Sequence, residues 1–151
     1  MKHLMVMMHS YGGIVGLVNS GNILNVYNSG NISVYSKSQR IMVGGIVGIA
    51  NNGELINSYN LGTITNVNQS SIYRMGEIEG VIQGEASVSN SFYLNNQPIG
   101  INYSSSLCVT TQVSRDDLKG DNVLNILNQN GIVWKKDTTN VNNGYPIFTW
   151  Q

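Results

Sequence analysis

The stretch GGIVGIANNGELINSYNLGTIT, residues 44–65, repeats the stretch GGIVGLVNSGNILNVYNSGNIS, residues 12–33, at an offset of 32 positions and without a gap. Glycine occupies five equivalent places in the two copies, and the pairs Asn25/Asn57, Tyr27/Tyr59 and Asn28/Asn60 also match. Agreement at so many places indicates a structural repeat rather than chance.

Each copy contains three short apolar segments, at 13–18, 23–27 and 31–35 in the first, separated by turns rich in asparagine and glycine. Segments of this length with a period of two predict β-strands, and Gly and Asn supply the positive φ angles that sharp turns need. We therefore predict an all-β fold, a parallel β-helix or solenoid in which each repeat makes one coil. An apolar core would stack Ile14, Ile23 and Ile32 on Ile46, Leu55 and Ile64.

Two side-chain amide ladders are expected along the axis, Asn25 over Asn57 and Asn28 over Asn60. A shorter third copy is predicted because Gly80–Gly84 resembles the opening of a repeat and Val88–Tyr93 resembles a later part, with about three residues lost between them. About three coils result, at 12–33, 44–65 and 80–94, within a repeat domain of residues 1–96. The intervening segments should protrude as solvated loops at 34–42 and 66–78.

Residues 97–151 are predicted to form a C-terminal capping region with a short helix and a pair of strands. Ser114 fits a helix N-cap completed by Asp117, and Gly120 divides the helix. The strands are expected at 132–134 and 147–150. Such a region would cover the unpaired strand edges at the end of a solenoid. Trp134 and Trp150 are expected to anchor its core, with carbohydrate stacking as the functional alternative.

Composition excludes several classes of protein. The 151 residues carry eight Lys and Arg against eight Asp and Glu, so the formal net charge is zero, and charged residues make up only 11 %. A nucleic-acid binder needs a surplus of basic residues, as does a polybasic membrane-surface protein. No apolar run approaches the roughly 18 residues of a membrane span, so no membrane insertion is expected. The apolar run Leu4–Met8 is too short for a signal-peptide core.

The repeated glycines, followed by an Asn/Gly turn and then by Asn-x-Tyr-Asn-x-Gly-x-Ile, resemble the GLUG repeat over about residues 10–94. This resemblance implies a bacterial surface or adhesin-like protein, because GLUG repeats occur in exoproteins and in stalk regions of secreted metallopeptidases. The C-terminal region resembles the tail that closes such arrays. Because Met8–Tyr11 replaces the residues that precede the second repeat, we expect a C-terminal fragment of a longer extracellular or cell-surface protein, preceded by further repeats. Its open N-terminal coil should allow self-association.

Acidic residues are candidates for a catalytic or calcium site. Glu77, Glu79 and Glu85 are the densest acidic group, yet no aspartate joins them, and solvated edge charges are expected, as for Glu54. Asp116, Asp117 and Asp121 lie where a helix starts, and their charges favour the positive end of its dipole. We therefore predict no metal site.

Other chemistry-bearing residues also lack partners in sequence. His3 and His9 are six apart, which is not the spacing of a metal pair on a helix. Gly12, Gly13 and Gly16 recur with the repeat and are interpreted as structural glycines, and Ser10 and Ser58 have no partner base. The single cysteine, Cys108, excludes an intramolecular disulfide and is expected to be a small buried hydrophobe. Accordingly, we predict no enzyme activity, no catalytic residues and no cofactor.

The sequence thus predicts a non-catalytic structural or adhesive repeat module that acts as a stalk or as a binding surface. Loops 34–42 and 66–78 would contact a host protein or glycan. Two alternatives stay open: an accessory stalk region of a secreted hydrolase such as an immunoglobulin A1-type metallopeptidase, and a glycan-binding β-helix.

Overall fold

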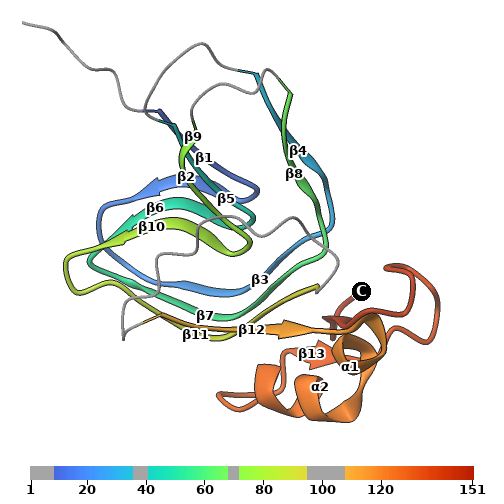
Figure 1. The fold of residues 1–151 in the computed structure, drawn as a ribbon. Helices are drawn as coiled ribbons and strands as arrows, with labels where there is room; N and C mark the ends of the chain where they lie inside the picture. Colours follow the sequence, from blue (N-terminus) through green and yellow to red (C-terminus); the bar gives the residue numbers. More distant parts are fainter. Residues whose placement is uncertain (1–8, 36–40, 68–71, 95–107) are drawn as a thin grey trace, which may run out of the picture.

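The computed structural model describes residues 9–35, 41–67, 72–94 and 108–151, which are mostly β-structure in parallel sheets with two short helices (Figure 1). We call the strands β1–β4 the first repeat, β5–β8 the second and β9–β11 the third. Their bounds are β1 His9–Gly12, β2 Val15–Val18, β3 Ile23–Asn28, β4 Ile32–Val34, β5 Ile41–Gly44, β6 Val47–Asn51, β7 Glu54–Asn60, β8 Ile64–Asn66, β9 Ile72–Gly76, β10 Glu79–Gln83 and β11 Ser87–Leu94.

Equivalent strands of successive repeats lie side by side and pair in parallel (Figure 1). One sheet has the order β1-β5-β9, a second β10-β6-β2, and β4 pairs with β8. The long sheet has the order β12-β11-β7-β3, where β12 is Cys108–Val113. The chain turns between β1, which ends at Gly12, and β2, which begins at Val15, before the long strand β3 begins (Figure 1). The all-β prediction is confirmed, whereas β12 was not predicted as a strand. The prediction of solvated loops at 34–42 and 66–78 is wrong where β5 and β9 lie, because these strands pair with each other and Ile41 and Met42 are buried.

Register between the first and second repeats follows the 32-residue offset throughout. Val15 pairs with Val47, Tyr27 with Tyr59, and Ile32 with Ile64. Pairing in register means that each side chain meets its own counterpart, so one pattern of apolar and amide residues serves both repeats.

The third repeat opens at a different residue from the one predicted. Gly76 pairs with Gly44, and Glu79 pairs with Val47, so the opening is Gly76–Gly80 and not Gly80–Gly84. The later pairing of Ser91 with Ser58 has an offset of 33, so the third repeat has gained one residue rather than lost three. The sequence obscured this register because glutamates replace a glycine and a valine of the pattern.

The predicted apolar stack is divided between two clusters. Ile46 and Leu55 belong to a core shared by the second sheet and the long sheet, whereas Ile64 packs with Val34, Ile41 and Val43, which join β4-β8 to the first sheet. Ile14 is 45 % exposed although its counterpart Ile46 is fully buried, because no described strand precedes the first repeat.

Both predicted amide ladders are confirmed. The Asn28 Nδ2 donates to Asn60 Oδ1 at 3.0 Å, and the Asn57 Nδ2 donates to Asn25 Oδ1 at 3.4 Å. The second ladder continues into the third repeat, where Asn90 Nδ2 donates to Asn57 Oδ1 at 3.1 Å. Asn25, Asn57 and Asn90 all have φ near +50°, with values of 53°, 57° and 48°. Asparagine therefore serves twice, because it tolerates the left-handed conformation and also bonds to the next repeat.

The motif glycines allow backbones to approach closely. A Cβ on Gly45 would lie 2.0 Å from the Glu77 carbonyl oxygen and 2.3 Å from the Asn60 amide nitrogen. At Gly48, a Cβ would lie 2.5 Å from the Gly16 carbonyl oxygen and 2.8 Å from the Tyr11 amide nitrogen. These contacts explain the recurrence of the glycines by packing, without a phosphate-binding role.

The C-terminal region contains helix α1 (Arg115–Lys119), helix α2 (Asp121–Leu127) and the antiparallel pair β13 (Trp134–Lys135) and β14 (Ile147–Phe148). Ser114 caps α1 by accepting a hydrogen bond from the Asp117 N–H at 3.1 Å, and Gly120 separates the two helices. The predicted helix, its cap, its division and the strand pair are therefore confirmed.

Strand β12 pairs with β11 and so covers the edge of the long sheet, as predicted for the C-terminal region. The helices and the pair β13-β14 differ from the prediction, because they lie along the outer side of that sheet (Figure 1). Tyr27 and Tyr59 stack with ring centroids 5.1 Å apart, and the buried Trp134 contacts both rings. The Trp134 Nε1–H donates to Asn25 Oδ1 at 3.0 Å, and the Tyr59 hydroxyl donates to the Pro146 carbonyl. Because consecutive repeats present identical tyrosines in register, they offer one continuous aromatic surface to the C-terminal region.

Substitution of equivalent glycines tests the stacking. A Cβ on Gly62 would lie 1.9 Å from the Gly30 carbonyl oxygen, whereas one on Gly30 would meet only Asn28 Oδ1, at 3.5 Å. We expect Gly62→Ala to lower the free energy of unfolding by ~2 kcal/mol or more, because the neighbouring backbone must shift. In contrast, Gly30→Ala should change it by less than ~1 kcal/mol. Urea denaturation measures both, and equal effects would contradict the stacking.

Candidate functional site

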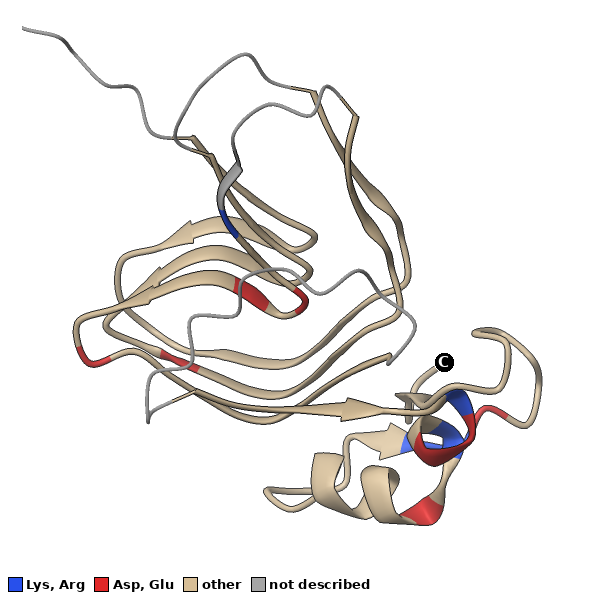
Figure 2. Cartoon of the chain, in the orientation of Figure 1, with Lys and Arg blue, Asp and Glu red and all other residues tan. Residues whose placement is uncertain are grey.

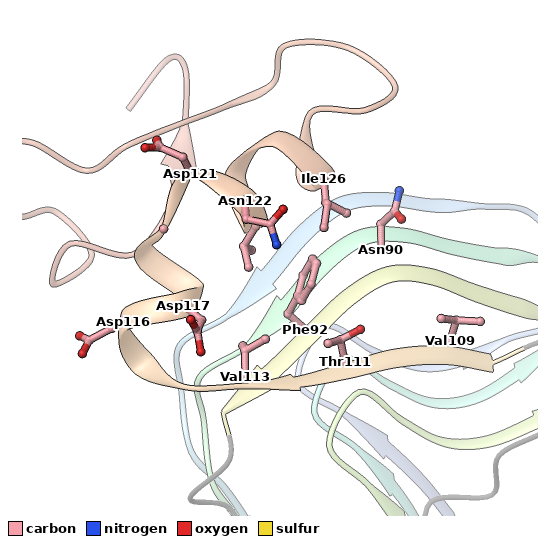
Figure 3. A pocket seen from close by; sticks show the side chains of 12 residues that line it. Asn90, Phe92, Val109, Thr111, Val113, Asp116, Asp117, Asp121, Asn122 and Ile126 are labelled. Atoms are coloured by element: carbon pink, nitrogen blue, oxygen red, sulfur yellow. The ribbon is translucent and has the colours of Figure 1, made fainter.

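A groove of about 510 Å³ lies between the outer face of the long sheet and the two helices (Figure 3). Strand β12 forms one wall and α2 the other, and the side chain of Phe92 on β11 lies between them. Val109, Thr111 and Val113 line the strand side because alternate residues of a strand face the same way. The groove was not predicted. The β-branched residues Val109, Thr111 and Val113 recur at every second position, and this spacing is the signal that could have revealed its wall.

Carboxylates lie at one end of the groove, where β12 leads into α1 (Figure 3). They are Asp116, Asp117 and Asp121. Asp117 accepts a hydrogen bond from the Ser114 hydroxyl at 2.5 Å, and Asp121 pairs with Lys136 at 2.6 Å. The Lys136–Asp121 pair is 52 % and 74 % exposed, so it contributes little to stability. The predicted position at a helix start is confirmed, because Asp116 and Asp117 lie in the first turn of α1 and Asp121 lies in that of α2. Asp117 also takes part in the cap.

Charge is distributed unevenly between the repeats and the C-terminal region (Figure 2). In the described part of the repeats, charged residues are few, whereas α1, α2 and the segments after them carry Lys, Arg and Asp close together. Charged side chains among the described residues are therefore concentrated in the C-terminal region, beside the groove.

Two glutamates of the third repeat are buried, which contradicts the prediction of solvated edge charges. Glu77 is 3 % exposed and Glu79 is 5 % exposed, and one carboxylate oxygen of each, Oε2, has no hydrogen-bond partner. They occupy the places of Gly45 and Val47, so the fold directs them inward. Burial raises the pKa of each carboxyl to about 7, because an ion loses its hydration there.

Cys108 contacts one of these glutamates. Its Sγ donates to Glu79 Oε1 at 2.6 Å, and its side chain packs against the core shared by the second sheet and the long sheet. Burial and the neighbouring Glu79 both raise the pKa of the thiol. The raised pKa holds the thiol protonated, which disfavours a nucleophile. The prediction of a small buried hydrophobe is only partly correct, because Cys108 is half-buried and donates to a glutamate.

The side chains of Glu77, Glu79 and Glu85, the acidic group that the sequence offers as a candidate site, do not share one environment. Glu85 is exposed on the turn before β11, whereas Glu77 and Glu79 are buried. Among the described residues, no group of three or more His, Cys, Asp or Glu could hold a metal ion. In the same part of the chain, no helix is long and apolar enough to cross a membrane.

The remaining candidates have structural contacts. His9 lies on β1 and stacks on Tyr11 with centroids 6.3 Å apart, whereas His3 lies outside the described residues. The Ser58 hydroxyl bonds to that of Ser91 at 2.8 Å. Ser10 lies on β1 and Glu54 is exposed at the start of β7.

The two tryptophans differ in environment. Trp134 is 1 % exposed and anchors the core as predicted. Trp150 is 72 % exposed and stacks on Phe148 with centroids 4.7 Å apart, so the core-anchor prediction is wrong for it. Trp150 has one open face because it lies beyond the end of β14.

A compact loop at 137–144 lies between β13 and β14, where a polar loop from Lys135 to Tyr145 is expected from the sequence, but the role of Asp137 in it was not predicted. The Asp137 carboxylate accepts hydrogen bonds from the backbone N–H groups of Val141, Asn142 and Gly144 at 2.9, 2.7 and 3.0 Å. These bonds lower the pKa of Asp137 to about 2. The loop holds Asn142, whose side-chain amide donates to the Tyr59 hydroxyl at 2.8 Å.

Residues 40–65 match the family model described as "The GLUG motif". The protein carries the GLUG motif. The matched segment contains β5, β6, β7 and most of β8, which is one repeat of the structure. The first repeat pairs with this GLUG repeat residue by residue, and the third pairs with it through Gly76 onward. No curated protein and no solved structure matches the chain at a significant level.

The buried glutamates predict that stability depends on pH. Their pKa is raised from 4.5 to about 7 on folding, so the folded GLUG protein binds protons more tightly than the unfolded chain. This contribution is fully present below pH 4.5 and is lost as pH rises through about 7. Each tenfold difference in proton affinity is worth about 1.4 kcal/mol.

We expect the free energy of unfolding, measured with urea, to fall between pH 4.5 and 8. Glu79→Val, which restores the residue of the other repeats, should reduce that fall and stabilise the protein at pH 8. The exposed Glu85→Gln serves as the control and should leave the pH dependence unchanged. If the free energy of unfolding of Glu79→Val changes with pH in parallel with that of the wild type, Glu79 is solvated and the account of its burial is contradicted.

Proposed function

We propose that the repeats form a parallel β-solenoid of about three coils, and that the chain is a non-catalytic structural or adhesive module of a secreted or cell-surface bacterial protein. The observation that carries this proposal is the unbroken parallel pairing of all strands of the second GLUG repeat with those of the first. Stacked repeats of this kind are extended by adding further repeats, which suits a stalk.

Internal bonding supports a stiff module. Each interface between repeats has backbone pairing on several sides, and the ladders of Asn25, Asn57 and Asn90 add side-chain bonds along the axis. The aromatic contacts of Tyr27 and Tyr59 with the C-terminal region link the first two repeats laterally. A stalk needs this combination because bonds on several sides resist bending.

Exposed apolar residues of the first repeat support a partner at that end. Tyr11 is 38 % exposed, Ile14 45 % and Leu17 46 %. Their counterparts in the second repeat are buried by the first. We therefore expect preceding repeats of a longer protein, or a second copy, to cover this end.

We expected loops 34–42 and 66–78 to contact a host protein or glycan. Because Ile41, Met42 and Ile78 are buried, only the exposed described residues of these segments stay proposed contacts. Their described parts are shorter than predicted, because Val34, Ile41–Met42 and Asn66 belong to strands, as does 72–76. Residues 36–40 and 68–71 lie outside the described residues. Tyr35 and Val67, 68 % and 42 % exposed, flank these segments and are accessible to a partner.

Glycan binding is a second candidate because of Trp150. An exposed indole held flat on Phe148 presents a rigid face, and aromatic faces of this kind suit stacking on sugar rings. Trp150→Ala would remove that face without opening the core.

A binding panel tests the proposal. The full chain is applied to a glycan array and to host extracellular-matrix proteins, with and without calcium, and each sample is analysed by mass spectrometry for cleaved products. We expect binding to one class without turnover, and Trp150→Ala should abolish it if glycans are the class. Catalytic product formation would contradict a non-catalytic module.

A further inference from the structure

We propose that the open end of the first repeat binds the strands of one further GLUG repeat, and that the side-chain amides of Asn25 and Asn28 recognise it. The inference deepens the proposed stalk role and rests on it, because it names what this end selects. Strands β1, β2 and β3 each lie at one edge of their sheet (Figure 1). Edge strands present backbone N–H and C=O groups with which a further strand can pair.

The apolar surface at this end corresponds to the surface that the first repeat covers on the second. Ile14 and Leu17 are 45 % and 46 % exposed. Their counterparts Ile46 and Ile49 pair with the first repeat at an offset of 32 and are buried. A further repeat in the same register would therefore bury Ile14 and Leu17, and it would continue an interface that the molecule already contains.

Asn25 offers a hydrogen-bond donor at this end. In its ladder each Nδ2 donates to the Oδ1 of the preceding repeat, from Asn90 to Asn57 at 3.1 Å and from Asn57 to Asn25 at 3.4 Å. The Asn25 Oδ1 also accepts from the Trp134 Nε1–H at 3.0 Å. In contrast, the Asn25 Nδ2 has no acceptor among the described residues, so an acceptor on a further repeat would continue the ladder.

Asn28 offers an acceptor, because its ladder runs in the opposite direction. The Asn60 Oδ1 accepts two hydrogen bonds, from the Gly62 N–H and from the Asn28 Nδ2, both at 3.0 Å. Within the described part of the chain, the Asn28 Oδ1 accepts only from the Gly30 N–H, at 2.9 Å. A carbonyl oxygen has two lone pairs, so Asn28 can accept a second bond from a further repeat.

The donor at Asn25 and the acceptor at Asn28 together identify the occupant. They require an acceptor and a donor three residues apart, and asparagine supplies either one because its amide carries both groups. The sequence Asn-x-Tyr-Asn of each GLUG repeat has this spacing. Its tyrosine would stack on Tyr27 as Tyr27 stacks on Tyr59, with ring centroids 5.1 Å apart. A GLUG segment therefore fits this end better than an apolar strand of another sequence.

A second copy of the chain does not supply the same groups. The other edge strand of the long sheet is β12, whose sequence CVTTQV contains no asparagine, so head-to-tail stacking would continue neither ladder. Two first-repeat ends related by a two-fold axis would oppose their strands in antiparallel orientation. The strands β1–β4 could not then all meet their counterparts.

A peptide experiment with matched charge variants tests this inference. The probe is a fluorescently labelled peptide of residues 41–66, and its binding to the full chain is measured by anisotropy. In the proposed register, peptide residue 57 lies beside Asn25 and peptide residue 60 lies beside Asn28. A carboxylate accepts but does not donate, so the Asn57→Asp peptide should bind within about threefold of the wild-type peptide. The Asn60→Asp peptide places two acceptors together and should bind at least about tenfold more weakly.

The complementary variant lies in the protein. Asn25→Asp keeps the acceptor for Asn57 and Trp134 and tolerates the positive φ, but it removes the donor. We expect it to weaken binding of the wild-type peptide at least about tenfold, whereas Val141→Asp, which adds the same charge in the loop at 137–144, should not. Circular dichroism checks that Asn25→Asp is folded, and the two variant peptides decide the question if it is not.

Three results would overturn the inference. They are absence of binding by the wild-type peptide, equal binding by the two variant peptides, and equal binding by folded Asn25→Asp and wild-type protein. Sedimentation velocity of the protein alone adds a further test, because a dimer that the peptide does not dissociate would place a second copy at this end.

Failure here is separable from failure of the proposed function. If the peptide does not bind while the panel still detects matrix or glycan binding, the adhesive module stands without this site. If product formation appears on the panel while Asn25→Asp weakens peptide binding, the site stands and the non-catalytic role is wrong.

Discussion

Close approach of backbones between repeats is the constraint on which the rest of the structure depends. A Cβ at Gly45 or Gly62 would overlap atoms of the adjacent repeat, and the overlap explains why glycine recurs at the same places. Once the repeats approach this closely, equivalent residues meet in register, and the Asn25–Asn57–Asn90 ladder can form. The aromatic surface formed by Tyr27 and Tyr59 depends on the same register.

Sequence reasoning recovered what depends on repetition or on local signals. The strands within 13–35 and 44–65, the parallel pairing of the first two repeats, both amide ladders and the cap at Ser114 were predictable, because each follows from a pattern within a few residues or from an offset of 32. The strands β5, β9 and β12 were not predicted. The placement of the C-terminal region was not predictable, because no short-range sequence pattern indicates which face of the long sheet Trp134 and Pro146 contact. The groove was missed for the same reason, because its walls come from separate elements.

The third repeat departs from the residue pattern of the first two repeats at two buried positions. Glu77 and Glu79 replace a glycine and a valine, which hid the register from sequence reasoning and led to the wrong prediction of solvated charges. Burial follows from the backbone position and not from the residue type, so these carboxyls carry a raised pKa, near 7. Cys108, contributed by β12, satisfies one oxygen of Glu79.

The most direct test of the central claim is cross-linking between paired residues. Ser33 and Thr65 are exposed partners on β4 and β8, and neighbouring parallel strands lie about 5 Å apart, within the reach of a disulfide. In a Cys108→Ser background, Ser33→Cys with Thr65→Cys should oxidise within the monomer, whereas Ser33→Cys with Thr63→Cys should not. Oxidation of the second pair in preference to the first would contradict parallel stacking at an offset of 32 residues.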